Sequence, residues 1–200
     1  MAGESGVSQP SMNRPSRPAG RGLERLILFS DAVFAIAITL LVLDVRLPAL
    51  PSPLTDGALA DALRSILPQV AAFAISFVVI AAFWVGHYRT FRFVHGLDGW
   101  LIFLNFAFLF FVVLLPFPTS VVAEAGNHPA AAILCAAFGL AIGALSAVIW
   151  IYPMRYAGLG DPAVGPELVR RITYRVLVIP AVFAASIPVA FANPLAAELM

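Results

Sequence analysis

The chain has 200 residues, of which 61% are hydrophobic and only 12% charged, with a formal net charge of +1. Soluble domains carry about 25% charged residues, so this composition and its long apolar runs exclude an ordinary soluble domain and predict an all-α integral membrane protein. The small net charge gives no indication of a nucleic-acid partner, and a lone cysteine, Cys135, excludes a disulfide framework within the chain.

The predicted elements begin after a basic tail at residues 1–20, which is rich in Gly, Ser and Pro and is expected to be disordered. The transmembrane domain occupies 21–200. Its five predicted spans are about 23–47, 68–93, 100–115, 129–152 and 172–192. At ~1.5 Å per residue the first span can cross a ~30 Å hydrocarbon core. A short amphipathic piece at 58–67 is expected at the membrane interface, and the two prolines of LPFPTS (115–120) are expected to break the third span.

Arginine placement predicts the orientation in the membrane. All twelve basic residues are arginine, and ten fall on one side if five spans alternate. Those ten are Arg14, Arg17, Arg21, Arg25, Arg89, Arg92, Arg155, Arg170, Arg171 and Arg175. The positive-inside rule then places the N-terminus in the cytoplasm and the connections at 48–66 and 116–128 outside.

Polar residues gather near the cytoplasmic ends of the first three spans. Ser30 and Asp31 lie in the first, Trp84 and His87 share a face of the second, and Asn105 lies in the third. Ionisable groups at such depths are costly and usually have a partner or a function, so a cluster that fixes helix packing beside an ion path is one interpretation. Equally, Asp31 could reach the interface and pair with Arg25, with Trp84 and His87 as interfacial residues.

An apolar stripe follows the aspartate on the first span. Ile36, Leu40 and Leu43 recur at i, i+4 and i+7 with Thr39 beside them, and at 100° per residue Asp31 points roughly 130° away from the stripe. The stripe could line a pore or simply contact lipid and other helices. A catalytic triad of Ser30, Asp31 and His87 has awkward geometry, and no ligand spacing suggests a metal site, so no enzyme activity is expected.

Three segments carry a family resemblance: Arg25-x-x-x-Phe29-Ser30-Asp31, FWVGHYRTF (83–91) and LNFAFLFFVVLLPFPTS (104–120). Over residues 21–194 the chain resembles the transmembrane protein 175 family, the lysosomal potassium channels and their bacterial homologues. The resemblance implies a potassium-permeable homotetramer in the bacterial inner membrane, with the first helix of each subunit around the axis and no cofactor. It implies a constriction at Ile36, Leu40 and Leu43, and a selectivity-related layer at Thr39. It also implies an interhelical network of Arg25, Phe29, Ser30, Asp31, Trp84, His87 and Asn105.

The number of spans departs from the family pattern. Family members of this type have six spans, whereas five are predicted in this chain. Two other functions stay open from the sequence. A proton-coupled transporter could use Asp31 and His87 as titrating groups, and a non-conducting membrane or assembly protein could keep the same fold.

Overall fold

The computed structural model describes residues 18–125 and 128–192, and these form helices joined by short connections, as the composition predicts. Of the predicted disordered tail at 1–20, residues 1–17 lie outside the described residues, whereas residues 18–20 form the first turn of a helix, contrary to the prediction. The elements are α1 (Pro18–Leu40), the 3₁₀ helix η1 (Leu41–Asp44), α2 (Asp56–Ser65), α3 (Leu67–Phe91), α4 (Gly99–Leu114), α5 (Pro116–Ala125), α6 (Pro129–Ile151), the π-helical segment η2 (Tyr152–Tyr156) and α7 (Pro166–Ala192).

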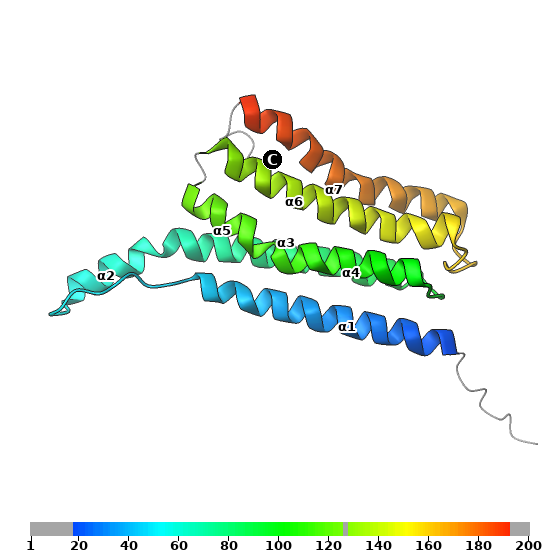
Figure 1. Cartoon of the computed structure of the whole chain (residues 1–200), viewed down its shortest axis with the longest axis horizontal. Helices are drawn as coiled ribbons and strands as arrows, with labels where there is room; N and C mark the ends of the chain where they lie inside the picture. Colours follow the sequence, from blue (N-terminus) through cyan, green and yellow to red (C-terminus); the bar gives the residue numbers. More distant parts are fainter. Residues whose placement is uncertain (1–17, 126–127, 193–200) are drawn as a thin grey trace, which may run out of the picture.

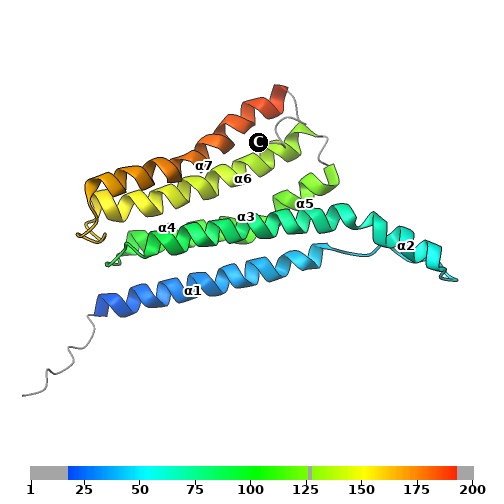
Figure 2. The ribbon, with the colours of Figure 1, turned by 180° about the vertical axis from the view of Figure 1, so that it is seen from behind.

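The long helices lie side by side in three groups (Figures 1 and 2). Helix α1 forms one edge of the bundle, α3, α4 and α5 occupy the middle, and α6 and α7 form the opposite edge. One side of α1 packs on α3 and α4, and no described element covers its other side. The position of α1 at the edge is the feature of the fold on which the functional site depends.

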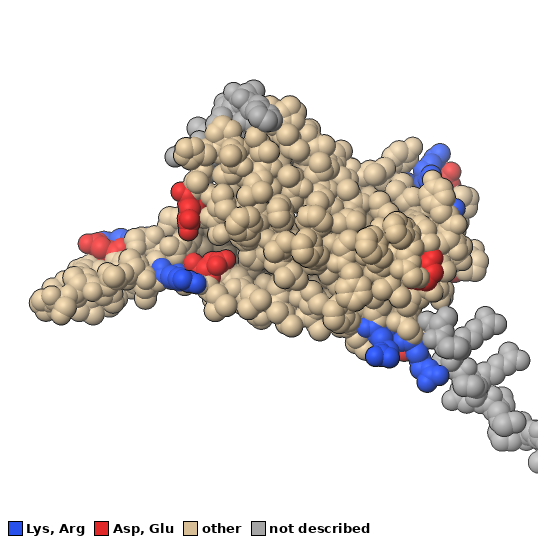
Figure 3. All heavy atoms as spheres, viewed as in Figure 1, with Lys and Arg blue, Asp and Glu red and all other residues tan. Residues whose placement is uncertain are grey.

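Four helical stretches of the described chain are long and apolar enough to cross a membrane: Gly20–Asp44, Asp56–Phe91, Gly99–Ala125 and Pro129–Tyr156. Charged side chains on the face shown in Figure 3 lie near the two ends of the long axis, with an uncharged belt between them. The chain is therefore a multi-pass membrane protein. The fifth predicted span, 172–192, lies within α7, which is not among these four stretches.

The connection after α4 differs from the sequence-based expectation. The prolines of LPFPTS do end α4 at Leu114, but the chain resumes at once as helix α5. Pro116 and Pro118 stand in the first turn of α5, where a missing backbone N–H breaks no helical hydrogen bond. Residues 116–125 of the predicted outer connection are thus helical, and the two stretches together form one membrane-length unit.

Small residues bring α6 and α7 into close contact. The buried face of α6 includes Ala136, Gly139, Gly143 and Ala147. A Cβ atom at Gly139 would lie only 2.4 Å from the ring of Phe183 on α7, so the glycine is what admits that ring. Apolar burial gives little driving force between helices in lipid, and close packing of this kind substitutes for it.

Contacts between the connection before α4 and the segment after α6 fix the end of the bundle where α4 begins. Asp98 caps α4 by accepting from the backbone N–H of Leu101 at 2.8 Å, and its other carboxylate oxygen accepts from the Tyr152 hydroxyl at 2.5 Å. Val94 and Gly160 pair as an isolated antiparallel bridge between the same two segments. These contacts join the start of α4 to the end of α6, the helix that packs beside it.

Candidate functional site

Three helices meet at a buried polar triad. Ser30 on α1 and Asn105 on α4 have no exposed surface, and His87 on α3 is 3% exposed. The Asn105 amide nitrogen Nδ2 lies 3.0 Å from Ser30 Oγ, and its oxygen Oδ1 lies 2.8 Å from His87 Nε2. The structure brings these three residues together, one from each of the first three predicted spans.

The directions of these hydrogen bonds follow from the single proton of the serine hydroxyl. Ser30 Oγ donates to the carbonyl of Leu26 at 2.8 Å, so it can only accept from Asn105. The amide nitrogen of Asn105 must then face Ser30, and its oxygen must face His87. Nε2 of His87 therefore carries the proton that is donated to Asn105 Oδ1. The triad is a fixed chain of donors that joins α3, α4 and α1.

Aromatic rings enclose the histidine. The His87 ring lies 4.4 Å from Phe91, 5.6 Å from Phe108 and 5.7 Å from Phe34, measured between ring centroids. Its other nitrogen, Nδ1, is buried without a hydrogen-bond partner among the described residues. The sequence analysis missed this enclosure, although a signal was present: each phenylalanine lies three or four residues after a triad member on the same helix.

The remaining members of the predicted network lie outside the buried triad. Trp84 Nε1 donates to Asp31 Oδ1 at 2.8 Å, and this pair lies near the surface, with Trp84 37% exposed. Phe29 contacts Phe106 of α4 with ring centroids 5.3 Å apart. Arg25 is exposed and makes no hydrogen bond or ion pair with another described residue, so the alternative Arg25–Asp31 pair is absent from this part of the chain. The predicted cluster thus divides into a buried triad and a peripheral Asp31–Trp84 pair.

The predicted stripe of α1 lies on its uncovered side. Ile36, Leu40 and Leu43 are 57%, 47% and 59% exposed, whereas Phe34, Ala37 and Leu41 of the same stretch are buried against the bundle. Ser30 belongs to this buried face. Helix α1 is therefore anchored through one face, and no other described part of the chain covers its opposite face.

Two local details shape the uncovered side. The chain tightens into η1 after Leu40, and residues three apart eclipse in a 3₁₀ helix, so Leu43 lies almost directly above Leu40. Thr39 is exposed, and its hydroxyl donates to the carbonyl of Ile36 at 2.9 Å. Because that proton is used, the threonine presents only oxygen lone pairs outward.

These features define a class: a multi-pass helical membrane protein whose first helix is fixed by an interhelical polar network and offers a bare apolar stripe. Comparison with known proteins identifies the family within this class. Residues 25–116 match the family model for the endosomal/lysosomal potassium channel TMEM175. The chain belongs to the TMEM175 family, which confirms the resemblance seen in the sequence.

The similarity extends along most of the chain. A potassium channel of Streptomyces collinus is 39% identical over 159 residues, which cover 76% of this chain and 74% of that protein. The crystal structure of a lysosomal potassium-selective channel TMEM175 homologue from Chamaesiphon minutus superposes with a TM-score of 0.74 at 30% identity, covering 89% of this chain and 91% of that one. The human endosomal/lysosomal proton channel TMEM175 is 28% identical over 197 residues, or 94% of this chain and 38% of the human protein.

Proposed function

We propose that the chain is a subunit of a potassium-permeable cation channel, a homotetramer whose pore is lined by α1 of each copy. The observation that carries the proposal is the division of α1 into an anchored face and a bare apolar stripe. Its family membership supports conduction, since the Streptomyces and Chamaesiphon relatives are named as potassium channels.

In this proposal the constriction is formed by side chains. Rings of Ile36, Leu40 and Leu43 from the four copies would narrow the pore and expel water, so that small movements of α1 switch conduction. Thr39, with its lone pairs outward, would give the polar layer beside that constriction and contribute to selectivity. The Ser30–Asn105–His87 triad would hold α1 at a fixed rotation and depth, and Arg25, Phe29, Asp31 and Trp84 would support it.

We also propose five spans with a cytoplasmic N-terminus, in the inner membrane of a bacterium. The arginine distribution supports this orientation, since ten of the twelve arginines fall on one side. Residues 172–192 of α7 would be the fifth span. Potassium ions and lipid would be the partners, and the proposal assigns the chain no catalytic role.

A second candidate is proton movement through the same subunit. The buried Nδ1 of His87, which has no hydrogen-bond partner among the described residues, favours it, because that nitrogen could take up a proton. The human relative is also named as a proton channel. Against a direct relay, His87 bonds to Asn105 while Asp31 bonds to Trp84, so the two titrating groups do not share a hydrogen bond.

Flux from potassium-loaded proteoliposomes tests the proposal. Vesicles containing the purified chain are diluted into sodium buffer with a pH-sensitive dye and a protonophore, so that potassium efflux draws protons inward and quenches the dye. We expect quenching in these vesicles and none in empty vesicles, with valinomycin giving the full signal in both. Potassium movement that requires an imposed proton gradient would favour the transporter, and no flux from folded tetramers would favour the non-conducting assembly protein.

A further inference from the structure

The segment between η1 and α3 projects beyond the bundle as an arm, which we define as residues 45–65 (Figures 1 and 2). The arm consists of a connection without regular secondary structure, residues 45–55, followed by helix α2. Thr55 caps α2 by accepting from the backbone N–H of Ala58 at 3.2 Å, and Ala62 of α2 is buried. The arm is therefore a folded element with a helix of its own.

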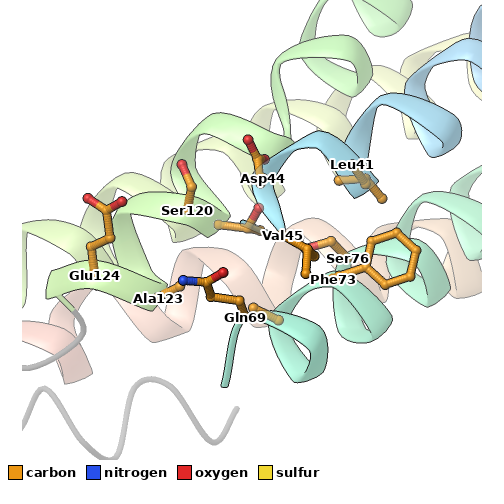
Figure 4. A pocket seen from close by; sticks show the side chains of 11 residues that line it. Leu41, Asp44, Val45, Gln69, Phe73, Ser76, Ser120, Ala123 and Glu124 are labelled. Carbon is orange, nitrogen blue, oxygen red and sulfur yellow. The ribbon is translucent and has the colours of Figure 1, made fainter. Parts of the chain in front are cut away.

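Polar groups mark the level at which this end of the bundle leaves the hydrocarbon core. Asp44, Gln69 and Glu124 line one cavity there, as Figure 4 shows. The backbone N–H of Arg46 donates to Gln69 Oε1 at 3.1 Å, so Gln69 on α3 lies level with the end of η1. Residues 69–91 of α3 already extend ~33 Å, which is enough to cross a ~30 Å hydrocarbon core. The arm, which comes before Gln69 along this helix, therefore lies outside the core.

The arm nevertheless presents an apolar surface. Four of its leucines are each between 41% and 52% exposed: Leu47, Leu50, Leu54 and Leu63. Outside the hydrocarbon core such side chains would meet water, and apolar groups that gather on an exposed surface mark an interaction site. The charged groups Asp61 and Arg64 of α2 form an ion pair with each other at 3.0 Å, so they require no charged partner. The arm thus fits an apolar partner.

Two features indicate that this partner is a second copy of the chain. The bare side of α1 runs on into the arm, since only three residues separate Leu43 from Leu47. In Figures 1 and 2, α2 also leaves the line of α3 and leans toward the edge of the bundle that α1 forms, away from α6 and α7. In a ring of identical copies around α1, each arm would therefore meet the adjacent copy at the same height.

We propose that the arms of adjacent copies pack together through these four leucines and form a collar around the pore mouth at the η1 end. This inference rests on the proposed tetramer, to which it adds a contact outside the membrane. If α2 instead lay flat on the membrane, as the sequence analysis expects for residues 58–67, the leucines would enter the lipid interface and would not join the copies.

Cross-linking between copies tests the collar. Leu54→Cys and Leu63→Cys are made separately in a Cys135→Ala background, reconstituted into vesicles at a low ratio of protein to lipid, and treated with a short bismaleimide that joins two cysteines. We expect at least one of the two variants to give bands at two, three and four times the mass of the chain on a denaturing gel. Single chains from both variants, after complete modification of their cysteines, would overturn the collar.

Leu168→Cys is the matched control for the cross-linking. Leu168 is 43% exposed on α7, at the edge of the bundle opposite α1, so this variant should stay a single chain. An equal yield of cross-linked chains from Leu168→Cys would show random collision and overturn the collar. The potassium flux assay separates this proposal from the proposed function. Cross-links without flux would keep the collar and remove the channel, and flux with single chains would do the reverse.

Leu63→Glu tests whether the leucines hold the copies together. In a collar the substitution brings four like charges close to one another, and like charges across an interface disfavour association. The tetramer of this variant should therefore dissociate at a lower SDS fraction in mixed micelles than the wild-type tetramer, as measured by light scattering. Leu168→Glu adds the same charge on α7 and should dissociate as the wild type does. Dissociation of Leu63→Glu at the wild-type SDS fraction would contradict packing through the leucines.

Discussion

Replacing Ile36 with asparagine is expected to raise cation flux through the reconstituted protein by about tenfold and to weaken the preference for potassium over sodium. Ile36 is 57% exposed on the bare side of α1. In a tetramer the change puts four amides into an apolar ring, so water can remain in the constriction and the barrier to ions falls. A fall of only ~1.4 kcal/mol is a tenfold rate. Flux from potassium-loaded and sodium-loaded vesicles measures both quantities.

The same substitution at Ile75 is the matched control. Ile75 lies on α3 and is 65% exposed, so both variants place an amide on an exposed helix surface. Ile75→Asn should leave the ratio of potassium to sodium flux unchanged. If Ile36→Asn gives the same flux and the same ratio as the wild-type chain, the stripe contacts lipid or another helix and does not line the pore.

Replacing Asn105 with leucine is expected to lower the free energy of unfolding by about 1–3 kcal/mol. The variant loses the bonds to Ser30 and His87, and it leaves the buried Nε2–H of His87 without an acceptor. An unsatisfied buried donor costs about 1–3 kcal/mol, whereas interhelical hydrogen bonds in membranes average about 0.6 kcal/mol, so the combined loss falls in this range. Unfolding in mixed micelles of rising SDS fraction measures it. Ser120→Ala, which removes a bond within one helix, should cost less than about 0.5 kcal/mol.

A double variant separates the hydrogen bonds from simple packing. His87→Phe places an apolar ring among Phe34, Phe91 and Phe108, and Ser30 keeps its bond to the Leu26 carbonyl. Removing both partners of a buried pair can be nearly neutral. Asn105→Leu/His87→Phe should therefore be more stable than Asn105→Leu alone. If the loss of unfolding free energy in the double variant equals the sum of the losses in Asn105→Leu and His87→Phe, the two side chains do not act as a pair.

The positions of the long helices could be predicted because membrane-length apolar runs leave few alternatives. The connection at Pro116 and Pro118 could not, since a proline that ends one helix is equally suited to the first turn of the next. In the structure both apply, because α4 ends at Leu114 and α5 begins at Pro116. Helix α5 supplies Thr119, Ser120 and Glu124 to a cavity between η1, α3 and α5, which the sequence analysis did not foresee.

That polar residues of the first three spans gather at one depth could be predicted from the sequence, but the division of the predicted network could not. Ser30 and Asp31 are adjacent and point 100° apart on α1, so only one of them can face α4. In the structure Ser30 faces α4 and bonds to Asn105, whereas Asp31 accepts a hydrogen bond from Trp84 near the surface. The change from α-helix to 3₁₀ helix at Leu41 also could not be predicted, because the apolar run continues without a break. This change places Leu43 almost directly above Leu40.

Thiol modification at Leu43 tests most directly whether the bare side of α1 lines the ion path. In a Cys135→Ala background, potassium current through a planar bilayer is recorded before and after a membrane-impermeant thiosulfonate, MTSET, reaches the η1 end of the bundle. Leu43→Cys should lose most of its current as the bulky cation attaches in the pore. Leu67→Cys, at a 61% exposed leucine beginning α3 near the same end, should keep its current. Complete labelling of Leu43→Cys with undiminished current would contradict a pore lined by α1.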